Sequence, residues 1–481
     1  MALYGLSMVL PPEGVPAIDA VRMIVSVLLA PFQVAVPALC YVRLRELKGS
    51  AEMAPGEAPY EENGSSALPV RPPARLRWPL VAAVLPGLLY GGFIVVNPLS
   101  LANVIDNAIS GPDLDRSRPT AQIAFGPAGR PVIMIADGLP QLTFCGDGTC
   151  ASHSTTTLEE YFDLHPAATV IADGTLVVAG WVGTGGDRME LEMFSCRPQG
   201  CAKRSVRPLR VAEKGWLHVH AAAVATPDGI AIASIAPSSD RSTASAELTL
   251  CRDVTCANPR TTRLGGTDPD STDVNVDNRI LAVTATADGR PVVAYIERVT
   301  GKVTVATCDS PTCAHPIVHP HDPSSQTYGW RYRSLRLQIA VRPDSRPVLV
   351  YNGDDHDDED STQILICTDT TCSGTPRRVE VRELDAIGAP GLALDPRGRL
   401  LLAGYYVGRD DLSLIMLVCE DDGCTRRTAI RLIQGLASAG HLDFAVGPDH
   451  LPHLVWFGRA NTEDDNFFHM LTCPDIRCGR G

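Results

Sequence analysis

The cysteines have the clearest chemical pattern in this sequence. Fourteen of the 15 cysteines form seven pairs with four residues between the partners, and only Cys40 stands alone. Structural zinc sites favour about two residues between paired cysteines and need four ligands per metal, which isolated pairs do not supply. The intervening residues are turn formers, and a hairpin loop of this length places its flanking residues within disulfide reach. We therefore predict seven disulfides, which require a location outside the reducing cytoplasm: Cys145–Cys150, Cys196–Cys201, Cys251–Cys256, Cys308–Cys313, Cys367–Cys372, Cys419–Cys424 and Cys473–Cys478.

Aromatic and histidine side chains gather in two further segments. Aromatic and polar groups at the mouth of a site suit stacking against a carbohydrate or a peptide. Packing of the same side chains between neighbouring repeats is an equally good explanation. Two histidines on one strand face can begin a metal site, but no third ligand is evident beside them. The candidate ligand-binding residues in these segments are Trp216, His218, His220, Tyr328, Trp330 and Tyr332.

Two other segments are rich in carboxylates. Residues 354–360 contain six acidic residues and one histidine. Ca²⁺ takes about six to eight oxygen ligands, so this segment is a candidate calcium site. Its spacing is not that of an EF-hand, and a solvated acidic loop is the main alternative. The candidate metal ligands are Asp354, Asp355, Asp357 and Asp358; Asp268 and Asp270 are candidates for binding a cation or a basic peptide, and we expect no other cofactor.

These residues belong to a unit that recurs seven times. The first cysteines of successive pairs are 51 to 59 residues apart. A turn of the Pro-Asp-Gly type precedes each pair, and an apolar run such as Pro291–Tyr295 follows the turn without alternation, as expected for a strand buried on both faces. A period of this length in an all-β pattern is typical of propeller blades with four strands each. We predict a seven-bladed β-propeller over residues 121–481, with residues 104–120 as a connector or as the strand that completes the seventh blade.

Two apolar segments precede the repeats. Residues 23–42 carry no charge, and the second segment, from Pro79, meets none before Asp106. A helix of about 20 apolar residues crosses a bilayer. Basic residues are concentrated between the segments, so the positive-inside rule places residues 43–78 in the cytoplasm as a Pro/Glu-rich linker. We expect transmembrane helices at 23–42 and 79–103, with residues 1–22 and the propeller on the extracytoplasmic side of the cell membrane; two buried soluble helices are the alternative.

The two faces of such a propeller differ in their loops. Turns between strands one and two, and between strands three and four, lie on one face and are short and uniform here. Loops between strands two and three, and between strand four and the next blade, lie on the other face and are long and variable. Because binding residues concentrate on loops held by a rigid scaffold, we expect the site on the long-loop face.

The repeat Arg-Pro-Val-x-x-Tyr followed by Cys-x4-Cys resembles repeats of bacterial extracytoplasmic propellers in the sialidase-like, Asp-box superfamily. The resemblance covers residues 121–478 and implies the architecture. The Asp-box motif Ser-x-Asp-x-Gly-x-x-Trp is absent, and the cysteine pair occupies the corresponding hairpin. No arginine triad and no Tyr/Glu nucleophile pair can be placed, so the resemblance transfers no catalytic residue.

The net charge and the absence of catalytic motifs in the repeats limit the classes of function that fit the sequence. A net charge of −13 disfavours a nucleic-acid partner, which requires a basic face. The repeats show no evident nucleophile, base or metal set. We therefore expect a membrane-anchored module that binds a carbohydrate, a peptide or a protein. A sialidase-like glycoside hydrolase is the first alternative, and a sensor that couples external binding to the membrane helices is the second.

Overall fold

The structure, a computed structural model, describes residues 104–109, 120–136, 139–160, 162, 166–184, 188–203, 208–213, 220–237, 244–267, 280–297, 302–322, 337–354, 360–385, 390–408, 412–436, 438–459 and 467–479. All regular secondary structure in these residues is β-strand. None of them forms a helix long and apolar enough to cross a membrane. The transmembrane helices expected at 23–42 and 79–103 lie outside the described residues.

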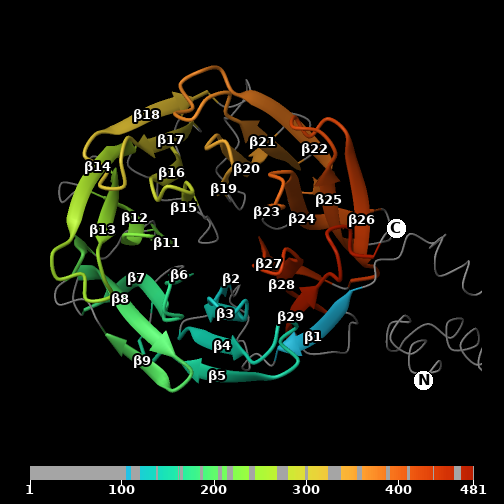
Figure 1. Cartoon of the computed structure of the whole chain (residues 1–481), viewed down its shortest axis with the longest axis horizontal. Coiled ribbons are helices and arrows are strands. Elements are labelled where there is room, and N and C mark those ends of the chain that lie inside the picture. Colours follow the sequence, from blue (N-terminus) through green and yellow to red (C-terminus); the bar gives the residue numbers. More distant parts are fainter. Residues whose placement is uncertain are drawn as a thin grey trace, which may run out of the picture. The chain divides into compact units, whose positions relative to one another are not determined.

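The strands form seven antiparallel blades around a central axis (Figure 1), which confirms the predicted propeller. Blade one contains β2 (Thr120–Phe125), β3 (Pro131–Ala136), β4 (Gln141–Cys145) and β5 (His153–Thr157). Blade two contains β6 (Ala167–Val170), β7 (Leu176–Gly183), β8 (Arg188–Arg197) and an outer strand in two pieces, β9 (Gly200–Lys203) and β10 (Arg210–Glu213). Blade three contains β11 (His220–Thr226), β12 (Gly229–Pro237), β13 (Ala244–Cys251) and β14 (Arg260–Thr267).

The other four blades repeat this order from the axis outward. Blade four contains β15 (Leu281–Ala285), β16 (Pro291–Ile296), β17 (Val303–Cys308) and β18 (Pro316–His321). Blade five contains β19 (Leu337–Val341), β20 (Pro347–Asp354), β21 (Asp360–Ile366) and β22 (Arg377–Asp385). Blade six contains β23 (Gly391–Leu394), β24 (Leu400–Val407), β25 (Leu412–Cys419) and β26 (Arg427–Ile433). Blade seven contains β27 (Ser438–Val446), β28 (Pro452–Arg459), β29 (Phe467–Thr472) and, as its outer strand, β1 (Ile105–Ile109).

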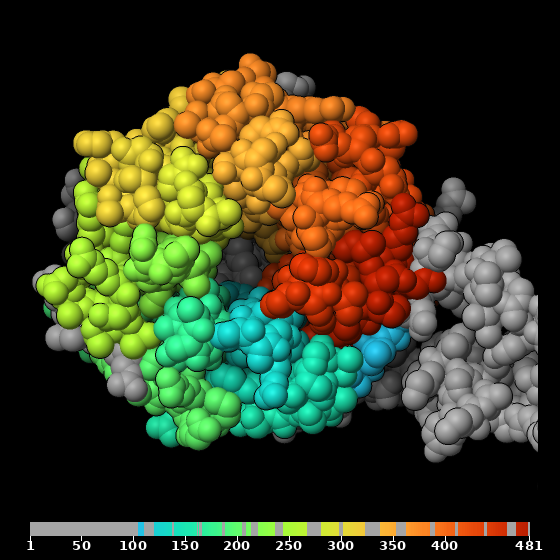
Figure 2. Space-filling model, in the orientation of Figure 1, coloured from blue at the N-terminus to red at the C-terminus, as the bar shows by residue number. Residues whose placement is uncertain are grey.

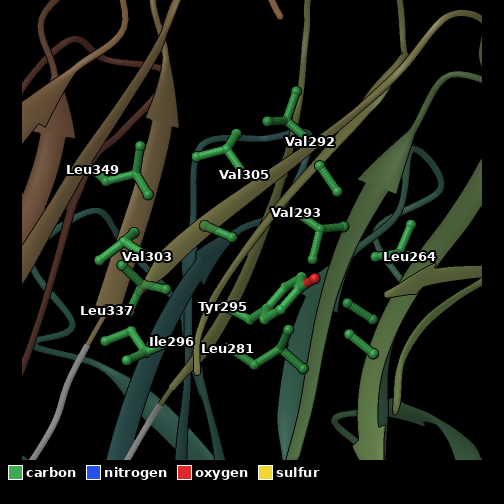
Figure 3. Packing of buried hydrophobic residues seen from close by; sticks show 14 of the residues in the cluster. Leu264, Leu281, Val292, Val293, Tyr295, Ile296, Val303, Val305, Leu337 and Leu349 are labelled. Atoms are coloured by element: carbon green, nitrogen blue, oxygen red, sulfur yellow. The ribbon is translucent and has the colours of Figure 1, made fainter. Parts of the chain in front are cut away.

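The hydrophobic cores lie between neighbouring blades. The second strand of each blade is buried on both faces, as in β16, where all six residues are buried. One core joins residues of blades three, four and five. In Figure 3, Tyr295 of β16 points toward Leu264 of β14, in the preceding blade. The apolar runs of the sequence therefore serve as the middle layer between two blade interfaces, which explains why they do not alternate.

The outer strand β1 completes blade seven from the other end of the chain. It pairs antiparallel with β29, from Ile105 opposite Thr472 to Ile109 opposite Phe468. Trp456 Nε1 donates to Asp106 Oδ1 at 3.4 Å, and Asp106 Oδ2 lies 3.2 Å from His469 Nδ1. The His469 ring stacks on Trp456 with 4.4 Å between ring centroids. These contacts hold in place a short strand of which only Ile109 is fully buried.

All seven predicted disulfides are present, with Cα–Cα distances of 4.1 to 4.9 Å. In six of the hairpins the second cysteine has a positive φ between 45° and 59°. Five of these six hairpins contain Asp two residues after the first cysteine, and its carboxylate accepts backbone N–H groups of the turn. Asp147, for example, accepts from the backbone N–H of Thr149 and from that of Ser152. In these five hairpins an aspartate side chain therefore stabilises the turn between the two cysteines.

Candidate functional site

A cavity of about 220 Å³ lies on the propeller axis, between the inner strands. We call it the central cavity; Figure 2 shows the hollow at the axis of the propeller. Its walls come mainly from the first residues of the inner strands, which follow the loops between blades. The cavity therefore lies toward the long-loop face. Its lining residues are Gln122, Ile123, Ala167, Ala168, His220, Ala221, Ala222, Ala223, Leu281, Ala282, Val283, Leu337, Gln338, Ile339 and Asp443.

The repeat places one equivalent position of each inner strand on a ring around the axis. This position lies seven residues before the last residue of the Pro-Asp-Gly type turn. Its occupants are Gln122, Ala167, Ala222, Ala282, Gln338, Gly391 and Asp443, in blades one to seven. Blades five, seven and one thus contribute the polar side chains, whereas blades two, three and four contribute alanines. At the ring positions the central cavity consequently has a polar side and an aliphatic side, and His220 of blade three adds a polar residue next to the alanines.

The polar side chains are held by the backbone of the next blade. Gln122 Oε1 accepts from the N–H of Ala168 at 2.8 Å, and its Nε2 donates to the carbonyl of Pro166 at 2.7 Å. Gln338 Oε1 accepts from the N–H of Leu392 at 2.6 Å, in blade six. The N–H of Ile123 donates to Asp443 Oδ2 at 2.7 Å, from blade one to blade seven. These bonds fix the orientation of the side chains and join three blade interfaces.

Gly391 lets two of these groups meet across blade six. Because blade six has no side chain at the ring position, Gln338 Nε2 reaches Asp443 Oδ1 at 3.3 Å. A Cβ on Gly391 would lie only 2.3 Å from Cβ of Phe444. Within the described lining, Asp443 is the only residue with a charged side chain. The site therefore combines one carboxylate and two carboxamides, positioned mainly by backbone groups, and its lining also includes His220.

His220 is the one predicted ligand-binding residue whose side chain the structure describes. It lies at the start of β11, lines the central cavity and is 6% exposed. Its carbonyl accepts a hydrogen bond from Trp181 Nε1 at 3.2 Å. The other predicted ligand-binding residues lie outside the described residues: Trp216, His218, Tyr328, Trp330, Tyr332, Asp268 and Asp270.

The predicted calcium ligands are only partly within the described residues. Asp354 is the last residue of β20, and its backbone pairs with Asp360 of β21. Asp355, Asp357 and Asp358 lie outside. Among the residues that the structure describes, no three His, Cys, Asp or Glu side chains are grouped as metal ligands.

The sequence reasoning missed Gln122, Gln338 and Asp443. A signal for them was present, because each is a polar residue at the same position of an otherwise apolar inner strand. The predicted site residues lie instead in the long loops and in local clusters along the chain. Comparing equivalent positions across the seven repeats would have found these residues.

Comparisons with known proteins give the fold alone. No protein-family model matches the chain, and no curated protein is similar to it in sequence. The solved structures similar to it include the intramolecular trans-sialidase from Ruminococcus gnavus, 9% identical with a TM-score of 0.41, covering 78% of this chain and 98% of the sialidase. The SapL1 lectin in complex with α-methyl fucoside is 10% identical, with a TM-score of 0.41, 67% of this chain and 99% of the lectin covered. The strands and disulfides of the chain itself define a seven-bladed β-propeller with a disulfide in every blade, and its structural neighbours include a trans-sialidase.

Proposed function

We propose that this chain is a membrane-anchored, extracytoplasmic propeller that binds a carbohydrate in its central cavity. The observation that carries the proposal is the two-sided wall of that cavity. A sugar ring presents hydroxyl groups at its edge and C–H groups on its faces. The amides and the carboxylate of Gln122, Gln338 and Asp443 suit the hydroxyls, and the alanines of blades two to four suit the C–H groups.

The predicted aromatic segments support the same location. Trp216 precedes His220 by four residues, and Tyr332 precedes Leu337 by five. An extended chain spans at most about 3.6 Å per residue. Trp216 is therefore held within about 14 Å of the cavity wall at His220, a reach that suits aromatic stacking at the rim of a sugar site.

The sequence supports the proposed membrane anchoring of the chain and the extracytoplasmic location of its propeller. The apolar segments 23–42 and 79–103 are long enough for transmembrane helices, and the chain enters the propeller directly afterwards at β1. Seven disulfides suit an oxidising compartment. Calcium binding by the segment around Asp354–Asp358 stays a prediction, which calcium titration of the full chain would test.

The decisive experiment is glycan binding by the full chain in lipid nanodiscs. We expect binding on a glycan array and in calorimetry, with loss of binding in Ala222→Phe, because the added ring fills the aliphatic side of the central cavity. Ser154→Phe is the matched control, since Ser154 is exposed on the outer strand β5. If no glycan binds, or if both variants bind like the unaltered chain, the proposal is wrong.

A glycoside hydrolase of sialidase-like architecture is the second candidate function. The observation in its favour is a carboxylate, Asp443, on the axial cavity. Hydrolysis ordinarily requires two carboxyl groups at about 5–10 Å separation, and the described lining contains one. Release of a fluorogenic aglycone by the full chain, abolished in Asp443→Asn, would favour the hydrolase over the binding module.

A further inference from the structure

We propose that the Cys196–Cys201 disulfide of blade two is a site of thiol–disulfide exchange, which a dithiol reductant opens while the other six disulfides stay closed. Opening this disulfide would loosen β9, the piece of the outer strand that carries Cys201, from β8. The proposal concerns the outer edge of one blade, so it is independent of carbohydrate binding in the central cavity.

Cys201 differs from the other paired cysteines in its exposure. Thirteen of the fourteen paired cysteines are buried, including Cys196, which is 0% exposed. Cys201 is only partly buried and packs against the core between blades one and two. Reduction begins when a thiolate attacks one of the two sulfur atoms, so its rate depends on access to that sulfur. Cys201 therefore offers a reductant an entry that the other disulfides do not.

The hairpin of blade two also differs in structure from the other six. Cys196 and Cys201 lie directly opposite each other in the pairing of β8 with β9. In each of the other hairpins the second cysteine has a positive φ, and its N–H donates to the carbonyl of the residue two after the first cysteine, as in Cys256 to Asp253. Blade two has Pro198 at that position, which offers no carboxylate to the turn. The different turn accounts for the different exposure of its second cysteine.

The outer strand of blade two does not continue from β9 into β10 in one register. Lys203 at the end of β9 pairs with Phe194, and Arg210 at the start of β10 pairs with Leu191. Six residues separate Lys203 from Arg210, whereas two separate their partners in β8. β9 is thus a short strand at the outer edge of the ring (Figure 1). Without the disulfide, its four residue pairs with β8 and the ion pair between Lys203 and Glu192 would hold it.

The exchange transfers two electrons from the reductant to the cysteine pair. A thiolate of the reductant attacks Sγ of Cys201, the S–S bond breaks, and Cys196 leaves as a thiolate that takes up a proton. The second thiol of the reductant then attacks the mixed disulfide, so that Cys201 is released as a thiol and the reductant leaves as a disulfide. β8 itself stays in place, because it pairs with β7 from Met189 to Cys196.

The test is the rate of reduction of each disulfide in the full, oxidised chain in nanodiscs. Dithiothreitol is added at a fixed concentration and pH, free thiols are trapped over time with N-ethylmaleimide, and the labelled peptides are identified by mass spectrometry. We expect Cys196 and Cys201 to be labelled about 10-fold faster or more than Cys251 and Cys256, because only the first pair has a partly exposed sulfur-bearing residue. Hydrogen exchange should then speed up in Gly200–Lys203 but not in β8.

The hairpin of blade three provides a matched control, because both hairpins begin with Cys-Arg. The triple variant Pro198→Asp/Gln199→Val/Gly200→Thr gives blade two the hairpin sequence of blade three. In this variant the disulfide of blade two should open as slowly as that of blade three.

Three results would overturn the proposal. The first is an equal rate of opening for all seven disulfides, and the second is a slower rate for Cys196–Cys201 than for the others. The third is a triple variant that opens as fast as the unaltered chain, because the hairpin is the feature that exposes Cys201. The comparison of rates within the unaltered chain needs no variant, so the test remains valid even if the triple variant fails to fold.

Discussion

The turns that join the first two strands of neighbouring blades pack on one another, and Gly398 provides a sharp test of this contact. Gly398 ends the turn of blade six with a φ of 78°. A Cβ added to it would lie 2.6 Å from Cδ and 3.1 Å from Cγ of Pro343, in the turn of blade five. Two effects should therefore destabilise Gly398→Ala: the strain of a left-handed backbone at alanine and the steric clash of its Cβ with Pro343.

The two effects can be separated with a matched glycine. Gly129 ends the turn of blade one with a φ of 73°, and nothing lies within 4 Å of a Cβ built on it. Gly129→Ala should lower the free energy of unfolding by about 1–2 kcal/mol, the strain of a left-handed non-glycine residue. Gly398→Ala should cost about 1–3 kcal/mol more, because overpacking is added to that strain.

The assay is urea unfolding of the full chain with its disulfides intact, comparing transition midpoints of the two variants and of Pro343→Ala. In a double-mutant cycle, Pro343→Ala should recover most of the extra loss in Gly398→Ala, because alanine has neither Cγ nor Cδ. Equal losses in Gly398→Ala and Gly129→Ala, or no recovery in the double variant, would refute turn-on-turn packing as a source of stability between these blades.

Three further predictions concern single polar groups. Hydrogen bonds from Ser152 and Thr149 outweigh desolvation and hold the pKa of the Asp147 carboxyl well below its usual range. Asp147→Ala should therefore lower the free energy of unfolding by about 1 kcal/mol at pH 7. In urea unfolding this difference from the unaltered chain should shrink below about pH 4, where the carboxylate becomes protonated in the unfolded state. Asp106→Ala should leave Trp456 Nε1 without its acceptor, and hydrogen exchange should then speed up in Ile105–Ile109 more than in any other strand of blade seven. Burial lowers the pKa of the His453 imidazole despite the nearby carboxylate of Asp449. The unfolded state therefore binds more protons below about pH 6.5, and the free energy of unfolding should fall from pH 7 to pH 5. In thermal melts, the melting temperature of His453→Asn should depend less on pH than that of the unaltered chain.

The fold could be predicted because each blade repeats the same local chemistry. A hairpin of turn formers between two cysteines specifies the end of strand three wherever it occurs, and seven copies specify the number of blades. The apolar run after each turn specifies the strand that two interfaces bury. The closing strand was harder to predict, since only Ile109 of β1 is fully buried and the strand is selected by its pairing with β29 and by Asp106.

For the candidate site, the sequence predicted the face of the propeller on which it lies but not the residues Gln122, Gln338 and Asp443. The predicted site residues cluster along the chain, in loops such as the one that ends at His220. Gln122, Gln338 and Asp443 are more than 100 residues apart in sequence. Gln338 meets Asp443 only across blade six, and closure of the ring brings the backbone next to Gln122 to Asp443. Their role depends on long-range geometry and on the missing side chain at Gly391, neither of which a local pattern contains.

The two sides of the central cavity differ in how freely they can change. On the polar side, each ring residue also binds the backbone of the next blade, so a substitution there alters an interface as well as the cavity wall. On the aliphatic side, the side chains of the alanines at 167, 222 and 282 cannot form a hydrogen bond to the backbone of the next blade. A larger or more polar residue at 222 or 282 would reshape the cavity while leaving these hydrogen-bonded interfaces intact, whereas Ala167 lies between the two residues that Gln122 binds. The shape of the central cavity is therefore most easily altered from blades three and four, whereas the position of Asp443 is tied to the closure of the ring between blades seven and one.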